Sequence, residues 1–400
     1  MNTDSMRKID RWAGEPLCFI LRVLDLLTKP LSLLKRPRPP VNFLFIKPSE
    51  MGAIILSYSL IEKIKEKYPG CNIYFLTFRT NRPLLDALKV LPPENILVID
   101  DKSLAGFAID TLVCLVKMGR LRIDVVFDLE LFSRFTAILA YLSGADKRIG
   151  YYGYHLEGLY RGNLLTHKIQ YNPLLHTAKS ILSLGEVLDF DTKPSPELPR
   201  RIDDSEIKIP QYFPLESRLS GLREKLAGLG IENGRRILLV NPGDGILPLR
   251  EWPQENFIAL CRMLLSDEAN RIVIIGTEGA TKKSAEIAAA LGRSKCLDLT
   301  GKTTVEDVLC LFNLASALIV NDCGLAHMAS LTNIKKFVIF GPESPQVFAP
   351  LRGDTRVIFA EFPCSPCLSA FNHRNSACRD NLCLKAITPE YVYQLVTKNL

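Results

Sequence analysis

The run ALIVNDCGLAHMAS, from Ala317 to Ser330, is followed closely by KKFVIFGPESP, from Lys335 to Pro345. Each segment begins with a short apolar stretch typical of a buried parallel strand and ends in polar, glycine or proline residues. Together they predict a strand, a loop, a helix, a second strand and a second loop. In open α/β sheets the ligand lies outside the carboxyl ends of the strands. We therefore expect one crevice to be bordered by Asp322, Gly324, His327 and Gly341.

The residues of the first segment suit a phosphorylated ligand. Gly324 permits close approach of the backbone, and a helix starting near Leu325 would direct amide groups and a positive dipole end at an anion. His327 would lie on the first turn of this helix, within reach of a phosphate. A structural interpretation stays open, in which Asp322 caps the helix and His327 is a satisfied polar residue.

The same alternation of apolar strands and amphipathic helices covers most of the chain. It begins with an expected strand at Asn42–Lys47 and an expected helix at Ile54–Pro69, and it restarts with a strand at Arg235–Gly245. A polar, proline-rich stretch from Asp189 to Pro214 interrupts it. The pattern predicts an α/β protein with two doubly wound, Rossmann-like domains facing a cleft. Because no G-x-G-x-x-G is present, hydride chemistry is set aside.

Composition and charge narrow the possible functions. The chain has 400 residues, 47% hydrophobic and 23% charged, which is a globular composition long enough for two domains. The net charge is +7, but residues 1–40 alone hold eight Lys and Arg against four acids. The remainder is nearly balanced, so no nucleic-acid partner is expected.

The N-terminal segment contains an apolar run from Leu17 to Leu34, interrupted by Arg22, Asp25, Lys29 and Pro30. The three charges fall on one face of a helix and leave the other face apolar, as in a helix lying in a membrane interface. The run is a poor spanning segment and lacks a signal-peptide cleavage site. Alternatively, the helix packs on the protein's own core. The basic segment KRPRPP (residues 35–40) then forms a stiff linker able to touch anionic lipid.

Four spaced segments resemble one known family: FIKPSEMGAIIL (residues 45–56), NPGDGILPLREWPQENF (241–257), LIVNDCGLAHMAS (318–330) and FGPESP (340–345). In this order, from Val41 to Leu400, the chain resembles glycosyltransferase family 9, the heptosyltransferase-like family of bacterial lipopolysaccharide assembly. The resemblance implies a GT-B fold and inverting, metal-independent transfer from a nucleotide sugar, typically ADP-heptose. It also implies a lipid-linked saccharide acceptor, no required cofactor, and a peripheral place on the cytoplasmic face of the inner membrane.

The resemblance also suggests how the chain is divided. We expect a membrane-surface segment and linker (residues 1–40), an acceptor domain (41–205), a nucleotide-sugar donor domain (206–388), and a C-terminal helix packing back at the domain junction (389–400).

The family's donor contacts can be transferred to matching positions of this chain. The candidate donor-binding set is Ser49, Gly52, Arg250, Glu278, Asp322, Cys323, Gly324 and His327. Arg250 stands where the family most often has Lys, and its permanently charged fork suits a diphosphate leaving group. Arg250 as a surface charge beside Trp252, and Glu278 as an ordinary loop acid, remain alternatives. Cys323 is expected to be a small filler, since the proposed transfer needs no nucleophilic cysteine.

The first loop departs from the family pattern. Heptosyltransferases usually carry an Asp, a candidate general base, directly after the loop glycine; here that position is Ala53. Glu50 lies three residues earlier and is the candidate catalytic base, with Arg250 as its catalytic partner at the diphosphate. The alternative is a non-catalytic nucleotide-sugar or glycan-binding relative that has lost its base.

Four of the eleven cysteines cluster near the C-terminus with C-x2-C-x10-C-x4-C spacing: Cys364, Cys367, Cys378 and Cys383. His373 lies within this segment. The spacing is compatible with a structural zinc site, with free buried thiols, or with disulfides, the last being least expected because nothing directs the chain to an oxidising compartment.

Overall fold

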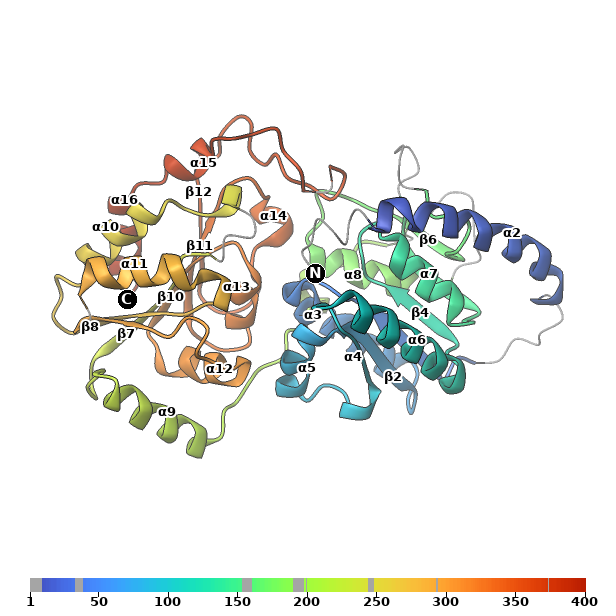
Figure 1. Cartoon of the computed structure of the whole chain (residues 1–400), viewed down its shortest axis with the longest axis horizontal. Coiled ribbons are helices and arrows are strands. Elements are labelled where there is room, and N and C mark those ends of the chain that lie inside the picture. Colours follow the sequence, from blue (N-terminus) through green and yellow to red (C-terminus); the bar gives the residue numbers. More distant parts are fainter. Residues whose placement is uncertain are drawn as a thin grey trace. The chain divides into compact units, whose positions relative to one another are not determined.

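A computed structural model describes residues 9–32, 39–152, 160–189, 198, 200–243, 248–292, 294–372 and 374–400. The side chains of residues 28–32 and 189 are not described. Several predicted features also lie outside the described residues: most of the expected 35–40 linker, residues 244–247 of GDGILP, part of the 189–214 stretch, and His373. The chain divides into two compact units, Met1–Lys208 and Ile209–Leu400. Each unit is an α/β structure built on one sheet (Figure 1).

Unit 1 contains a six-stranded parallel sheet in the order β3-β2-β1-β4-β5-β6. Its strands are β1 (Asn42–Ile46), β2 (Asn72–Phe78), β3 (Ile96–Ile99), β4 (Val125–Asp128), β5 (Lys147–Tyr152) and β6 (His167–Gln170). Its helices are α2 (Gly14–Ser32), α3 (Met51–Leu56), α4 (Tyr58–Lys67), α5 (Arg82–Leu88), α6 (Leu104–Leu121), α7 (Arg134–Leu142) and α8 (Thr177–Glu186). The order reverses between β1 and β4, so the carboxyl ends of these two strands form the switch point of the sheet.

Unit 2 repeats this topology in the order β12-β11-β10-β7-β8-β9, again all parallel. Its strands are β7 (Arg236–Asn241), β8 (Asn270–Ile274), β9 (Cys296–Asp298), β10 (Ala317–Asn321), β11 (Lys335–Phe340) and β12 (Thr355–Phe359). Its helices are α9 (Glu216–Gly228), α10 (Gln254–Leu264), α11 (Thr281–Leu291), α12 (Val305–Leu314), α13 (Gly324–Ala329), α14 (Pro345–Phe348), α15 (Leu382–Lys385) and α16 (Pro389–Asn399). The predicted fold class, two doubly wound parallel sheets, is confirmed.

The expected strand–helix alternation is present, with local differences. The single helix expected at Ile54–Pro69 is two helices, α3 and α4, separated at Ser57. The hydroxyl of Ser57 donates to the carbonyl of Ile54 at 2.7 Å, and such local bonding competes with the regular helical pattern. The edge strands β6 and β12 were not predicted, because each is only partly buried and lacks a long continuous apolar run.

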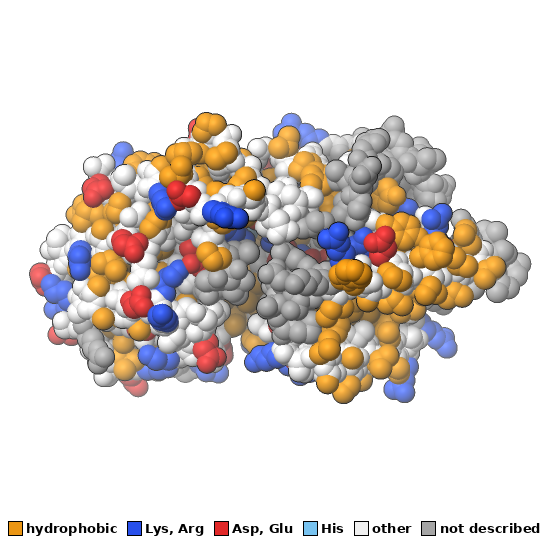
Figure 2. Space-filling view, turned by 45° about the horizontal axis from the view of Figure 1, so that its top comes forward, with side chains coloured by type: hydrophobic (Ala, Val, Ile, Leu, Met, Phe, Trp, Pro, Cys, Tyr) orange, Lys and Arg blue, Asp and Glu red, His pale blue; other side chains and the backbone are white. Residues whose placement is uncertain are grey.

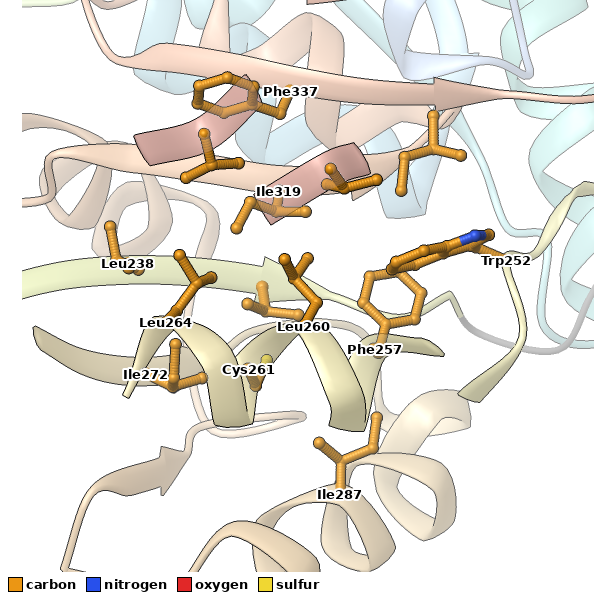
Figure 3. Packing of buried hydrophobic residues seen from close by; sticks show 14 of the residues in the cluster. Leu238, Trp252, Phe257, Leu260, Cys261, Leu264, Ile272, Ile287, Ile319 and Phe337 are labelled. Carbon is orange, nitrogen blue, oxygen red and sulfur yellow. The ribbon is translucent and has the colours of Figure 1, made fainter. Parts of the chain in front are cut away.

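The core of unit 2 anchors the loop that precedes α10. Trp252 is 1% exposed, and its ring packs edge-on against Phe257 with centroids 5.0 Å apart (Figure 3). The indole Nε1 donates to the carbonyl of Ile387 at 2.8 Å. Helix α16 contributes Val392 and Val396 to the same core. The buried Trp252 therefore fixes the position of the residues just before it. The expected contact of α16 with the domain junction stays a prediction.

Helix α2 packs against α7 in unit 1. Cys18 is fully buried in a small cluster with Ala137 and Leu164. Of the charges expected on one face, Asp25 faces inward, 3.5 Å from Arg148, whereas Arg22 and much of the apolar face are exposed. No helix within the described ranges is long and apolar enough to cross a membrane.

Candidate active site

Loops after neighbouring strands of unit 2 bring several predicted donor residues together. Strand β10 lies between β7 and β11, and Asn321 ends it. The Oδ1 atom of Asn321 accepts a hydrogen bond from the backbone amide of Trp252 at 3.0 Å. Since Trp252 follows Arg250 by two residues, this bond holds the β7–α10 loop against the end of β10 and places Arg250 beside Asp322.

Arg250 and Asp322 form a two-point contact. The Nη2 atom of Arg250 donates to Oδ2 of Asp322 at 2.6 Å and to its backbone carbonyl at 2.8 Å. Their side chains are 17% and 6% exposed. Burial alone would lower the pKa of Arg250, but the charges of Asp322 and Glu343 raise it overall. The guanidinium therefore stays charged, and its Nε has no hydrogen-bond partner among the described residues.

Two residues that were not predicted extend this cluster. Glu343, in the FGPESP segment, is 1% exposed, and its Oε1 lies 3.8 Å from Nη1 of Arg250. The same oxygen lies 3.4 Å from Nε of Arg374, whose guanidinium stacks over Phe348. The position of Glu343 in the loop that follows a buried strand, three residues after Phe340, was a usable signal, as was that of Asp322 directly after Asn321. Arg374 lies in an irregular segment with no sequence pattern that indicates its partner.

Helix α13 differs from the expectation. It begins at Gly324 after Cys323 as N-cap, and no side chain caps it, so the alternative role of Asp322 as a cap is wrong. The helix has only six residues, and its dipole is correspondingly weak. His327 lies on this helix and is 8% exposed. Burial raises the pKa of the Cys323 thiol to about 11, which keeps it neutral and fits a filler better than a nucleophile.

The remaining predicted positions of unit 2 are more separate. Glu278 is exposed at the start of the short turn Glu278–Ala280, and no hydrogen bond or ion pair joins it to Arg250 or Asp322 in the described part of the chain. A depression of about 290 Å³ lies beside it, lined by Gly243, Gln254, Gly279, Ala280, Lys282, Lys283 and Glu286. Gly341 has a packing role, since a Cβ there would lie 2.5 Å from Cγ of Leu384.

In unit 1, the loop after β1 forms an ionic cluster with the loop after β4. The ammonium of Lys47 is 2.8 Å from Oε2 of Glu50 and 3.0 Å from Oε2 of Glu130. The hydroxyl and backbone amide of Ser49 donate to Oε1 of Glu130 at 2.7 and 3.1 Å. Glu130 was not predicted, although it lies only two residues after β4, which pairs with β1.

The geometry of this loop distinguishes its two carboxylates. Glu50 is the N-cap of α3 with φ 63° and ψ 85°, a left-handed conformation unusual for a residue with a side chain. Its side chain is 33% exposed, whereas Glu130 is 14% and Lys47 1% exposed. Burial would lower the pKa of Lys47, but Glu130 and Glu50 raise it overall, so the cation is retained. Gly52 and Ala53 are buried in the first turn of α3.

A second buried charge lies at the carboxyl end of β4. Asp128 is fully buried, and burial raises the pKa of its carboxyl to about 7 against the opposing effect of Arg161. Arg161 is 3% exposed, donates to the carbonyl of Tyr151 and stacks over Phe132. The sequence pattern predicted neither the buried carboxyl of Asp128 nor its neighbour Arg161, because Asp128 is simply the last residue of an apolar strand.

The four C-terminal cysteines do not form the predicted zinc site. Within the part of the chain that the structure describes, which omits His373, no group of three or more His, Cys, Asp or Glu is placed to hold a metal. All four thiols are free; Cys383 is buried and Cys378 donates to the carbonyl of Asp380 at 3.0 Å. The thiols are free, but Cys364 and Cys378 are exposed and Cys367 is partly exposed, so the interpretation as free buried thiols fits Cys383 alone.

Two doubly wound parallel sheets with polar loops at their switch points are the architecture of GT-B glycosyltransferases. The chain belongs to glycosyltransferase family 9 (heptosyltransferase), whose model matches residues 119–377. It is therefore a glycosyltransferase, and the resemblance seen in the sequence is confirmed.

Individual relatives have low sequence identity to this chain. Lipooligosaccharide heptosyltransferase 2 of Haemophilus influenzae is 26% identical over 327 residues, covering 80% of this chain and 88% of that protein. The ADP-heptose LPS heptosyltransferase II structure of Escherichia coli has a TM-score of 0.68 at 21% identity and covers 89% of this chain and 98% of its own. The E. coli heptosyltransferase WaaC with ADP has a TM-score of 0.59 at 15% identity, covering 90% and 100%. These structures establish the fold.

Proposed function

We propose that this enzyme transfers a heptose-like sugar from an ADP-linked donor to a lipid-linked saccharide of the lipopolysaccharide core or a related envelope glycan. The transfer inverts the anomeric centre and needs no metal. The observation that carries the proposal is the buried Arg250 guanidinium held on Asp322 at the end of β10. The relative that was solved with ADP supports an adenine nucleotide as the leaving group.

The donor diphosphate would contact Arg250. This side chain is charged and held at two points, and its Nε has no hydrogen-bond partner among the described residues. A fixed guanidinium can neutralise the charge that develops on a departing diphosphate without rearranging during the reaction. Glu343 and Arg374 would act through Arg250 by holding the plane of its guanidinium in place. His327 and Gly324 are proposed to border the same diphosphate from α13, and Cys323 to fill space behind it.

The acceptor hydroxyl would be deprotonated by Glu50. The oxygen of the acceptor hydroxyl forms the new bond to the anomeric carbon, while the bond from that carbon to the diphosphate oxygen breaks. The proton of the hydroxyl passes to the Glu50 carboxylate. Glu50 is more exposed than Glu130, which already accepts two hydrogen bonds from Ser49. We assign Ser49 and Gly52 to shaping this loop and Glu278 to a donor hydroxyl.

Unit 1 would hold the acceptor and unit 2 the donor, with domains at residues 41–205 and 206–388 and a C-terminal helix at 389–400. The two compact units, which meet between Lys208 and Ile209, support a boundary in this region. Residues 1–40 would hold the enzyme at the cytoplasmic face of the inner membrane, where a lipid-linked acceptor lies.

Calorimetric titration with ADP-, GDP- and UDP-sugars in the presence of EDTA tests the donor site. We expect saturable binding of the ADP-sugar by the wild type. Arg250→Gln should weaken it about 10- to 150-fold, the range for losing one charged hydrogen-bond group. Arg262→Gln, which removes an exposed arginine from α10, is the matched control. His327→Ala should also weaken binding. Equal affinities of Arg250→Gln and the control would refute the assigned site.

Glu50→Gln tests the catalytic base and the non-catalytic alternative. We expect turnover to fall by at least about 100-fold with donor affinity unchanged, because the amide cannot accept the proton. Glu62→Gln, a carboxylate on α4 paired with Lys65, is the control. Unchanged turnover would remove Glu50 from the mechanism, and absence of any transfer by the wild type would favour the binding-only relative.

A further inference from the structure

Helix α6 has an outward face made of apolar side chains. Leu104, Ile109, Leu112, Val113 and Val116 are between 45% and 64% exposed. The opposite face of the helix buries Cys114 and Met118 in the core of unit 1. A helix that is apolar on both faces is normally covered on both. The outer face of α6 is therefore left uncovered by the described residues of unit 1.

The charges of α6 are segregated from this face. Asp110 is the only acid of the helix, and it is turned toward Arg79, at 2.6 Å, and toward the backbone amide of Asp100, at 2.9 Å. The bases lie at the C-terminal end, where Lys117, Arg120 and Arg122 are exposed. The helix thus presents apolar side chains followed by a basic end.

Helix α2 and the residues just before it are similar in part. Asp10 accepts from the amide of Phe135 at 2.7 Å and Asp25 lies beside Arg148, whereas Glu15, 3.7 Å from Arg134, is 58% exposed. The exposed side chains include Trp12, Leu17, Phe19, Ile20, Val23, Leu24, Leu26 and Leu27. Arg11 and Arg22 are exposed among them.

Helix α7 joins these two faces. It packs on α2 through Ala137 and Cys18, and on α6 through Phe135, whose ring lies 4.9 Å from that of Phe107. Leu142 at its end is 44% exposed. Figure 2 shows hydrophobic side chains gathered over this part of unit 1. The three helices therefore present one apolar surface with a basic margin.

We propose that the outward faces of α2, α7 and α6 form a single docking surface for an anionic lipid membrane. The inference rests on the proposed membrane contact of residues 1–40 and extends it to α6, a helix of the α/β fold itself. Apolar side chains enter the boundary between headgroups and acyl chains, and the basic margin meets the anionic headgroups. A second copy of the chain would bring the same basic margin, so charge complementarity favours lipid over self-association.

Vesicle co-sedimentation of the full chain tests this surface. The variant Leu112→Glu with Val116→Glu places two charges on the outer face of α6, and Leu215→Glu with Leu229→Glu places two at exposed positions of unit 2. On phosphatidylcholine vesicles containing about one third phosphatidylglycerol, we expect the α6 variant to bind at least tenfold more weakly and the control to match the wild type. Phosphatidylcholine alone should bind the wild type more weakly.

A fluorescence reporter gives an independent reading. Trp12 and Trp252 are the only tryptophans of the chain, and Trp252 is buried. In Leu112→Trp with Trp12→Phe, the new indole should shift to the blue and be quenched by brominated lipid when vesicles are added.

Three outcomes overturn the inference: equal vesicle binding by the α6 variant and the wild type, no quenching of the residue 112 indole, or a dimer that the α6 variant dissociates in light scattering without lipid. Measuring sugar transfer to a water-soluble acceptor analogue separates the test of the membrane surface from the test of the proposed reaction. The α6 variant should retain it, so loss of vesicle binding with intact transfer concerns the membrane surface alone.

Discussion

Neutralising Asp128 should change the pH dependence of stability in unit 1. Its carboxyl is fully buried, and burial raises its pKa from 3.8 to about 7. The folded state then binds more protons than the unfolded state between these two values. Stability contributed by this group is consequently present at low pH and is lost as the pH rises toward 7.

The magnitude follows from the pKa difference. A shift of about three pH units at 1.36 kcal/mol per unit corresponds to about 4 kcal/mol. Asp128→Asn keeps the shape and an acceptor for the Glu130 amide, which donates to Oδ1 of Asp128 at 3.2 Å. The variant should match the wild type near about pH 4 and be more stable by up to about 4 kcal/mol near pH 8.

Hydrogen exchange by mass spectrometry measures this effect for unit 1 by itself. Wild type and Asp128→Asn are compared at each pH, so that the intrinsic exchange rate cancels. The protection of β1 and β4 should diverge with rising pH, while β7 and β10 in unit 2 provide an internal control. A difference that stays constant, or that shrinks as the pH rises, would refute the burial argument.

Two further predictions concern the ionic and aromatic anchors. Lys47→Met removes the cation between Glu50 and Glu130, so the free energy of unfolding of unit 1 should fall by about 3–5 kcal/mol in urea denaturation near neutral pH. The loss should be smaller at acid pH, where the carboxylates are neutralised. A loss independent of pH would contradict this prediction. Trp252→Phe removes the indole donor from the carbonyl of Ile387, which keeps only the 3.5 Å bond from Asn256, so unit 2 should lose about 2–4 kcal/mol, with unit 1 unchanged in hydrogen exchange. An unaltered unit 2 would show that the indole bond contributes nothing.

Much of the fold was predictable because its signals are local. Central strands such as β10 are buried on both faces and therefore appear as uninterrupted apolar runs. The edge strands β6 and β12 were missed since their outer positions tolerate polar residues. The expected Ile54–Pro69 helix is divided at Ser57, whose hydroxyl donates to the carbonyl of Ile54, and apolar periodicity does not reveal this break.

The candidate site was predictable only in part. Asp322 and Arg250 were both singled out, but their two-point contact depends on Asn321 and Trp252 holding separate loops together. The cysteine spacing suggested a metal site that the described thiols do not form.

The amino-acid sequence by itself determined the α/β class, the doubly wound order of elements, the family, and the first members of the donor set, because apolar periodicity and short motifs are properties of neighbouring residues. Only the tertiary structure decided that Glu130 joins Glu50 on Lys47, that Glu343 and Arg374 extend the Arg250 cluster, and that α6 exposes an apolar face. These features arise where strands and helices distant in sequence become neighbours. Charge pairing and burial act through space, so their partners emerge only when the chain has folded.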